Sequence, residues 1–316
     1  MDNLSKGINY TLLSVLAHPD DETFGMGGTL ALYAQRGVDV YLVCATRGEV
    51  GDVDPEHMNG YKTAGEAREA ELRCAAEKLG LAGVYFLDYR DSGMPGSPDN
   101  HHPQALAAAP LEEVAAKVAH YIRLLKPQVV VTFDPIGGYR HPDHIAIHQA
   151  TVRAFEAAGA ANWQPPSPLT KELPPYSSQK LYFHTMSRRF IRVAMRIMPL
   201  LGRDPHKFGR NGDIDLATLA GDDFPIHATI DYSRTAQLKA EASACHASQG
   251  GVGMTRGLMG WAVRLTGNKD SFMRAYPPQA DGKRERDLFQ GIRLNSTEGL
   301  VLSRQGKPED STVTRD

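Results

Sequence analysis

Two short runs of the sequence place imidazole and carboxylate groups next to one another. They are residues 17–22, with the sequence AHPDDE, and residues 141–144, with the sequence HPDH. Imidazole nitrogen and carboxylate oxygen are ligands that zinc and its neighbours in the divalent series accept. Two such runs at one edge of a sheet could supply three ligands and still leave groups for proton transfer. This composition is typical of a hydrolytic metal site.

Each run also has a simpler interpretation, in which it only begins a helix. Asp20 or Asp21 could cap the helix after the first run, and Asp143 could stabilise the first turn of the helix in the second. Capping accounts for one carboxylate, but adjacent carboxylates repel one another unless a cation or a proton lies between them. The two runs together therefore favour metal binding.

The elements that would position these runs alternate between strand and helix. Apolar runs predict strands at residues 10–16, 38–45, 84–87, 129–133, 181–185 and 226–230. Helix-forming stretches occupy residues 25–35, 64–79, 111–125, 142–158 and 234–247. Buried strands separated by helices predict an α/β fold with a mostly parallel, Rossmann-like sheet and helices on both faces.

Both runs directly follow a predicted strand. In open parallel sheets, ligands bind at the carboxyl ends of the strands, near the point where the strand order reverses. The chemistry and the fold therefore point to the same edge. We expect one domain over residues 1–295 with a variable helical insertion around 186–225 and 250–275. The polar, charged residues 296–316 predict a disordered tail.

The intact AHPDDE and HPDH runs, in this order, resemble those of the LmbE/PIG-L family of zinc-dependent N-acetylglucosaminyl deacetylases. The similarity extends over about residues 10–249. Runs at 47–49 (RGE), 66–69 (EARE) and 89–94 (YRDSGM) resemble the bacterial branch that includes the mycothiol-pathway deacetylase and the mycothiol conjugate amidase. The resemblance implies an LmbE-like fold and removal of an N-acetyl group from an N-acetylglucosamine compound. It implies Zn2+ as cofactor, although Fe2+ accepts the same ligand types.

The resemblance also implies how the site is divided between ligands and a base. His18, Asp21 and His144 would bind the metal, and Asp20 would be the general base that takes a proton from the metal-activated water. The chemistry agrees, because three protein ligands leave an open position for water in a catalytic zinc site. The metal would bring the pKa of that water towards neutrality and polarise the amide carbonyl.

Further residues are implied around the reacting amide. His141 and Tyr139 would stabilise the oxyanion, and Asp143 would lie behind His141 and fix its orientation. His246 has two open interpretations, contact with the substrate or partial burial in its helix. The residues expected to bind the sugar are Glu49, Arg68, Asp91 and His246.

Composition argues against several other classes of protein. The 35 basic and 37 acidic residues nearly balance, so no global field favours nucleic acid or an anionic membrane. No apolar run reaches the roughly 18 residues of a membrane span. Cys44, Cys74 and Cys245 form no CxxC pair, and we expect them to be small core residues of a cytoplasmic protein. The expected partner is a small amino-sugar substrate, and the sequence leaves open whether the protein forms a homo-oligomer.

Two segments invite other interpretations. Residues 25–28 (GMGG) do not fit the G-x-G-x-x-G spacing of a dinucleotide site, and the acidic run before them would repel phosphates. Residues 186–210 depart from the family and hold seven basic residues against one acid. A packed amphipathic helix, a lid, an oligomer contact and docking on a membrane are all open for this segment.

The function itself has two alternatives. One is an amidase that cleaves a larger N-acyl group, as in the detoxification of thiol conjugates. The other is a catalytically retired sugar-binding protein. The intact Asp20 and His141 argue against retirement, because sugar binding alone would not require a base.

Overall fold

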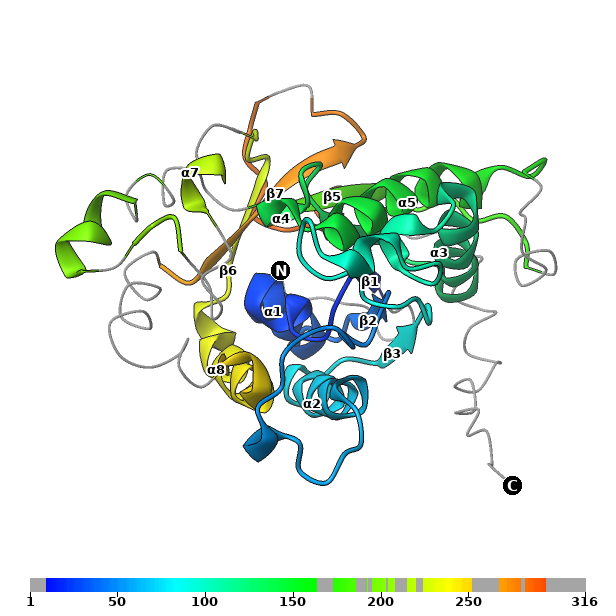
Figure 1. Cartoon of the computed structure of the whole chain (residues 1–316). Coiled ribbons are helices and arrows are strands. Elements are labelled where there is room, and N and C mark those ends of the chain that lie inside the picture. The colour runs from blue at the N-terminus through cyan, green and yellow to red at the C-terminus, as the bar shows by residue number, and fades with distance from the viewer. Residues whose placement is uncertain are drawn as a thin grey trace.

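The computed structural model describes residues 10–163, 173–185, 192, 195–202, 204–207, 215–219, 224–251, 267–279 and 282–293 (Figure 1). Its strands, in chain order, are β1 (Thr11–Leu16), β2 (Asp39–Cys44), β3 (Gly83–Phe86), β4 (Val129–Phe133), β5 (Lys180–Thr185), β6 (Ala228–Asp231) and β7 (Lys269–Tyr276). Its helices are α1 (Asp21–Gln35), α2 (Ala64–Leu79), α3 (Leu111–Leu125), α4 (Gly137–Arg140), α5 (Pro142–Gly159), α7 (Leu216–Leu219) and α8 (Ala236–Cys245). Short 3₁₀ turns follow α8 and several loops.

The strands form one sheet of seven, in the order β3-β2-β1-β4-β5-β7-β6. The first five are parallel, and β7 is antiparallel to both of its neighbours. From β1 the chain proceeds outward to β2 and β3, and it then returns to place β4 on the other side of β1. The strand order therefore reverses between β1 and β4, and their carboxyl ends flank the crevice where such sheets bind ligands.

Helices cover both faces of this sheet, as predicted. In Figure 1, α3 and α5 pack together on one face, and α1, α2 and α8 pack on the other. Strands β1 and β4 are buried along their whole length because they lie in the centre of the sheet under both helical layers. The apolar stripe of α3 supplies much of the covering core: Val114, Ala115, Val118, Ala119 and Ile122.

Local signals account for the boundaries of the best-predicted helix. Helix α2 begins after Thr63, whose hydroxyl accepts a hydrogen bond from the Glu66 backbone N–H at 3.2 Å, while the Glu66 carboxylate accepts one from the Lys62 N–H at 2.8 Å. It ends at Gly80, which has a φ of 73° that a glycine adopts without strain. The prediction of residues 64–79 is thus confirmed.

Two predictions about the elements need correction. Helix α1 begins at Asp21, four residues before the predicted start, so the acidic run itself enters the helix. A helical insertion was expected around 250–275, but Lys269–Tyr276 is strand β7, which forms ladders with β5 and β6. The sequence of β7 did not predict a strand, because polar residues alternate with its buried positions and weaken the apolar signal. Residues 252–266 and 294–316 lie outside the described residues.

The cysteines also differ from the expectation. Cys44 is a buried free thiol, as expected, but Cys74 and Cys245 form a disulfide between α2 and α8 across 171 residues of sequence. The distance in sequence hid this pair, since only the packing of α8 on α2 brings the two side chains together. Among the described helices, none is long and apolar enough to cross a membrane.

Candidate metal centre and active site

The loops after β1 and β4 bring the two histidine-carboxylate runs together at the strand-order reversal. His18 follows β1, and His144 lies in the first turn of α5. The His18 Nδ1 and His144 Nε2 atoms lie 3.2 Å apart although 126 residues separate them in sequence. Both side chains are almost fully buried. The prediction that one sheet edge collects both runs is therefore confirmed by the geometry.

Asp21 completes a triangle of donor atoms with the two histidines. Its Oδ2 lies 3.6 Å from His18 Nδ1, and its Oδ1 lies 3.3 Å from His144 Nε2. Donors arranged tetrahedrally at about 2.0–2.1 Å from one ion are separated by roughly 3.4 Å. All three distances are near that separation, with a different Asp21 oxygen facing each histidine.

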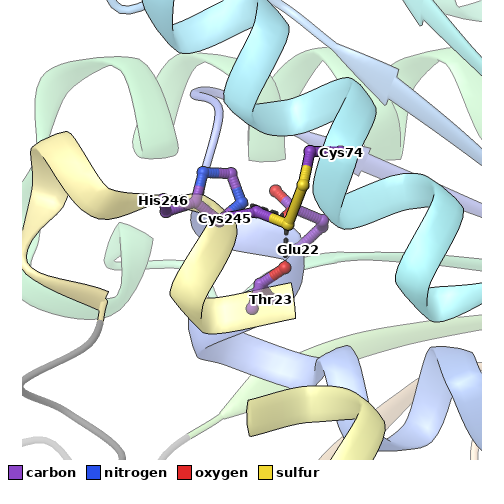
Figure 2. The surroundings of a disulfide bond; sticks show 5 residues. All are labelled: Glu22, Thr23, Cys74, Cys245 and His246. Atoms are coloured by element: carbon purple, nitrogen blue, oxygen red, sulfur yellow. Dashed lines mark hydrogen bonds and ion pairs between the residues drawn. A yellow bond between two sulfur atoms is a disulfide. The ribbon is translucent and has the colours of Figure 1, made fainter. Parts of the chain in front are cut away.

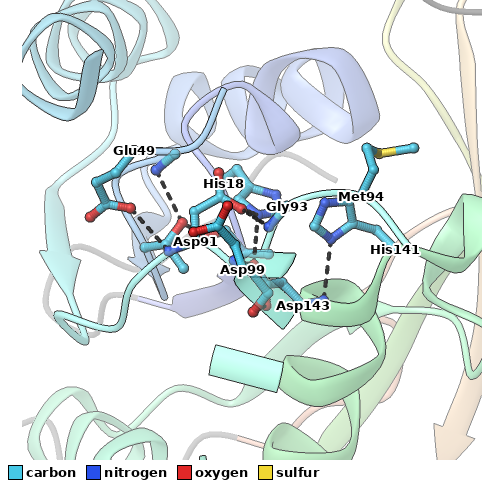
Figure 3. Close-up of polar contacts among 12 residues, drawn as sticks. His18, Glu49, Asp91, Gly93, Met94, Asp99, His141 and Asp143 are labelled. Atoms are coloured by element: carbon cyan, nitrogen blue, oxygen red, sulfur yellow. Dashed lines mark hydrogen bonds and ion pairs between the residues drawn. The ribbon is translucent and has the colours of Figure 1, made fainter. Parts of the chain in front are cut away.

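The other nitrogen of each histidine is held by an acceptor. His18 Nε2 lies 3.1 Å from Asp143 Oδ2 and 3.5 Å from Asp91 Oδ1, as Figure 3 shows. His144 Nδ1 lies 3.2 Å from the Gly137 carbonyl oxygen. Ligating histidines use such acceptors to fix the ring and its tautomer. The arrangement thus leaves one nitrogen of each ring directed at the common position.

The charges around His18 also favour a cation. Burial alone would lower the pKa of His18, but Asp91, Asp143 and Asp21 together raise it well above its ordinary value. Burial alone would raise the pKa of Asp21, but His144 and His18 together lower it well below its usual range. Two overlapping sets of described side chains here could hold a metal ion: His18, His141 and His144 form one, and His18, Asp91 and Asp143 form the other.

Asp20 lies beside this cluster in an unusual backbone conformation. Its φ is 122°, in a region that residues other than glycine seldom adopt. One Asp20 carboxylate oxygen accepts a hydrogen bond from the Arg68 guanidinium at 3.2 Å. Burial raises the pKa of Asp20 to about 6, with Arg68 opposing the rise and Asp21 adding to it. A carboxylate with a pKa near the operating pH is suited to act as a general base.

His141 and Tyr139 face the same cluster. The His141 ring lies 4.6 Å from the His18 ring and 5.0 Å from the His144 ring, between centroids. Its Nδ1 accepts a hydrogen bond from the Asp143 backbone N–H at 3.2 Å, so the neutral ring carries its proton on Nε2. Burial and the two neighbouring histidines lower the pKa of His141 to about 2. His141 is therefore a neutral hydrogen-bond donor rather than a cationic acid.

The Tyr139 ring packs 4.9 Å from the His144 ring, and burial raises the pKa of its hydroxyl well above the ordinary value. The tyrosine therefore stays protonated and can donate a hydrogen bond. It is positioned by α4, a short turn in which Asp134 Oδ1 accepts a hydrogen bond from the Gly138 N–H at 2.8 Å. Tyr139 packs against a small apolar cluster of Leu216 and Leu219, which Met195 and Met198 also contact.

The expected role of Asp143 needs correction. It was expected to orient His141, and its backbone N–H does donate to His141 Nδ1. Its carboxylate, however, lies against His18 and accepts hydrogen bonds from the Ser92 backbone N–H, at 2.9 Å, and from the Ser92 hydroxyl. Only the backbone of Asp143 contacts His141. The first turn of α5 directs the carboxylate inward to the loops that carry His18 and Ser92, which the spacing of the HPDH run did not reveal.

The expected sugar-binding residues occupy two kinds of position. Glu49 is half-buried, and its Oε2 accepts a hydrogen bond from the Asp91 backbone N–H at 3.1 Å. Asp91 and Arg68 are almost fully buried, against His18 and Asp20 respectively. A polar cavity of about 390 Å³ opens beside Glu49, lined by Arg47, Glu49, Asp88, Tyr89, Arg90 and Gln104.

His246 does not reach the expected substrate position. Its side chain is fully buried, and its Nε2 lies 2.7 Å from Glu22 Oε1, behind the loop that carries Asp20. Sequence reasoning missed Glu22, although it ends the first run, because nothing in the sequence places a partner beside it. It also missed Phe133, whose ring stacks on His144 at 3.9 Å between centroids. As the last residue of a strand, Phe133 gave no separate signal.

The glycines of residues 25–28 have a packing explanation. A Cβ atom at Gly28 would lie 2.2 Å from the Tyr232 ring, so a larger residue would displace it. A Cβ atom at Gly25 would lie 3.5 Å from the His184 ring, which is an ordinary van der Waals contact. These residues let α1 approach its neighbours, and the rejection of a dinucleotide site is consistent with this packing.

Comparison with known proteins agrees with this site. The sequence pattern of the family described as GlcNAc-PI de-N-acetylase, PIG-L, matches residues 13–155. A 1D-myo-inositol 2-acetamido-2-deoxy-alpha-D-glucopyranoside deacetylase from Kineococcus radiotolerans is 35% identical, over 90% of this chain and 84% of its own. The protein of the same name from Thermomonospora curvata is 36% identical, over 89% of this chain and 96% of its own.

Solved structures share the fold at lower identity. N,N'-diacetylchitobiose deacetylase from Pyrococcus horikoshii has a TM-score of 0.57 at 21% identity and covers 91% of this chain and 88% of its own. GalB, the 4-carboxy-2-hydroxymuconate hydratase of Pseudomonas putida, has a TM-score of 0.54 at 19% identity and covers 86% and 98%. A deacetylase and a hydratase on one fold indicate that fold alone does not decide the reaction. The level of identity to the two deacetylases, over nine-tenths of the chain, does decide the family: this chain belongs to the GlcNAc-PI de-N-acetylase (PIG-L) family.

Proposed function

We propose that this protein hydrolyses the N-acetyl amide of an N-acetylglucosamine-containing small molecule or glycoconjugate. The observation that carries the proposal is the triangle of His18, Asp21 and His144 donor atoms with Asp20 beside it. In this proposal the three residues bind Zn2+, with Fe2+ as the alternative. The metal supplies Lewis acidity, which lowers the pKa of water and polarises the amide carbonyl.

The remaining steps belong to side chains of this protein. Asp20 takes a proton from the attacking water and returns a proton to the departing amine nitrogen, which releases acetate. The His141 Nε2–H and the Tyr139 hydroxyl donate hydrogen bonds to the oxyanion of the tetrahedral intermediate. Arg68 holds the Asp20 carboxylate through the hydrogen bond described above.

The substrate would enter past Glu49 and Asp91. Carboxylates of this kind accept hydrogen bonds from sugar hydroxyls, and the polar cavity beside Glu49 offers room for the group attached to the sugar. Because the two relatives are named as deacetylases of a 1D-myo-inositol glycoside, we infer an inositol glycoside as the first substrate to test. A larger N-acyl group remains the second candidate, favoured by the open, polar character of this cavity.

The test is a panel of N-acetylated glycosides scored by the free amine that is released. Wild type should act on the inositol glycoside and more weakly on a minimal N-acetylated sugar, and Asp20→Asn should act on neither. Release of amine only from substrates with longer acyl chains would favour the amidase. Sugar binding without any release of amine would favour the retired protein.

The setting of the enzyme is also part of the proposal. We infer a small-molecule substrate without nucleic acid or membrane partners, and size-exclusion chromatography with light scattering would test for a homo-oligomer. The cytoplasmic location predicted from the sequence stays a prediction. The Cys74–Cys245 disulfide argues against a reducing compartment, and cell fractionation would decide.

A further inference from the structure

Glu22 ends the first histidine-carboxylate run but takes no part in the proposed chemistry. Its side chain is fully buried. Its Oε2 accepts a hydrogen bond from the Asp20 backbone N–H at 3.0 Å, and its Oε1 accepts one from the Thr23 hydroxyl. The same Oε1 lies 2.7 Å from His246 Nε2, as Figure 2 shows. Glu22 therefore connects the backbone of the proposed base to a histidine 226 positions away from Asp20.

Glu22 contacts the backbone of Asp20, which has the unusual φ described above. A φ of 122° is costly for a residue other than glycine, so it persists only where its surroundings fix it. Two side-chain contacts hold the peptide group before Asp20: the Glu22 carboxylate accepts from the Asp20 N–H, and the Arg68 guanidinium donates to the Pro19 carbonyl oxygen at 2.8 Å. The Asp20 carbonyl oxygen accepts backbone hydrogen bonds from the Thr23 and Phe24 N–H groups at the start of α1. The direction of the Asp20 carboxylate depends on these contacts.

His246 lies in a turn that is attached to α2 both before and after this residue, and this attachment places its ring beside Glu22. The residue before it, Cys245, forms the disulfide with Cys74. Two residues after it, the Ser248 N–H and hydroxyl donate to the Glu71 carboxylate at 2.8 and 2.7 Å. His246 Nδ1 makes no hydrogen bond with any described residue, so the contact with Glu22 sets the orientation of the ring.

We propose that His246 is a positioning residue of the reaction, which acts through Glu22 to fix the backbone of Asp20 and so to aim its carboxylate. This inference rests on the proposed function. Its physical basis is that a buried carboxylate with a fixed partner cannot rotate away from the N–H that it accepts. Without His246, Glu22 would be a buried carboxylate whose remaining side-chain partner is Thr23, and it would reorient.

The first arm of the test replaces His246. His246→Ala and His246→Asn, which is too short to reach Glu22, should lower kcat by roughly 10–100-fold, the usual loss when a supporting contact of a metal site is removed. KM and the bound metal should change little. His246→Gln, whose amide can donate to Glu22, should restore a large part of kcat. The matched control is His227→Ala, because His227 accepts a hydrogen bond from the Arg274 N–H outside the site and its loss should leave kcat unchanged.

The second arm is a double-mutant cycle with Asp20→Asn. If His246 acts through Asp20, then His246→Ala should cost little once the base is gone, and the two losses in kcat will not multiply. Independent losses that multiply would overturn the inference, as would failure of His246→Gln to restore activity. If His246→Ala does not fold, the cycle with His246→Asn decides. Failure of the proposed function looks different, because wild type itself would then release no amine from any N-acetylated glycoside.

Discussion

At the scale of single residues, the site is organised by which atom of each ring or carboxylate faces the common metal position. His18 presents Nδ1 to that position and Nε2 to Asp143 and Asp91. His144 presents Nε2 and leaves Nδ1 to a backbone carbonyl. These assignments separate residues that would bind the metal from residues that would orient the ligands, and each group can be tested by its own measurement.

The base can be tested by removing its charge. Asp20→Asn keeps the size of the side chain but cannot accept a proton from water, so kcat should fall by about 10²–10⁴-fold. The metal content, measured by elemental analysis, should stay at the wild-type value. His144→Ala is the contrasting variant, and it should lose the metal itself. Turnover of Asp20→Asn close to wild type would remove Asp20 from the mechanism.

The pH profile can be tested through Arg68. The Asp20 carboxyl, with a pKa raised to about 6 by burial, is active as a base only when ionised, so kcat/KM should fall as the pH drops through the acid limb. Because Arg68 lowers that pKa, Arg68→Gln should move the acid limb to higher pH. Arg73→Gln, an exposed change on the same helix, is the control. If the acid limb does not move, a group other than Asp20 sets it.

The role of Asp143 can be tested by whether its replacement changes metal affinity, as support of His18 predicts, or the pH profile, as orientation of His141 predicts. Since its carboxylate contacts His18, Asp143→Asn should weaken metal affinity by about 10–100-fold, measured by competition with a chelator. At saturating metal most of the activity should return. Unchanged affinity with an altered pH profile would instead support the role that the sequence predicted, orientation of His141.

At the scale of elements, the attachment of α8 to α2 links the outer layer to the loop of Asp20. Helix α2 carries Arg68, Glu71 and Cys74, so one helix contacts both the base and the turn that carries His246. Helix α5 begins with the second metal-type run, and α4 before it positions Tyr139. The active site is therefore built at the ends of elements, and its precision depends on how they pack.

The disulfide can be tested at this scale. Replacing Cys74 and Cys245 together by serine should lower the free energy of unfolding by about 2–4 kcal/mol, because the cross-link restricts the unfolded chain. The loss in kcat should be smaller than that of His246→Ala, since Ser248 still binds Glu71. Denaturant unfolding and steady-state kinetics measure the two effects. Reduction of wild type with a phosphine should reproduce them and leave the double serine variant unchanged; an insensitive wild type would contradict the prediction.

At the scale of the whole molecule, the site lies between two halves of the sheet and ties them together. The His18 loop belongs to the β1 side, and His144 belongs to the β4 side. A metal bound by both should stabilise the folded state over the unfolded chain, which has no preformed site.

Metal removal should therefore lower the melting temperature. At a free metal concentration of about 100 times Kd, linkage adds about 2.7 kcal/mol, which corresponds to a shift of roughly 5 °C for a domain of this size. Calorimetry of the chelated protein, and of the same sample with Zn2+ restored, measures the shift. His144→Ala should melt at a temperature that chelation does not change; an equal response in that variant would place the metal elsewhere.

The sequence by itself determined the chemistry of the site and most of the elements. Strongly periodic segments such as α2, α3 and β4 matched their predicted ranges, because local propensity and burial agree there. The two runs with His18 and His144 were visible because their residue types are costly to place together without a cation. Strand β7 could not be predicted from the sequence, because its residues are polar and half-buried. They form a strand through pairing with β5 on one side and β6 on the other.

Only the tertiary structure decided which groups face one another. The Asp143 carboxylate contacts His18 rather than His141, His246 lies behind Glu22 rather than beside the substrate, and Cys74 forms a disulfide with Cys245. Each of these contacts joins residues that are far apart in sequence, so no local spacing encodes it. The packing of α8 on α2 and of α5 against β1 brings them together, and burial then makes each pairing specific, because a buried polar group without a partner is costly.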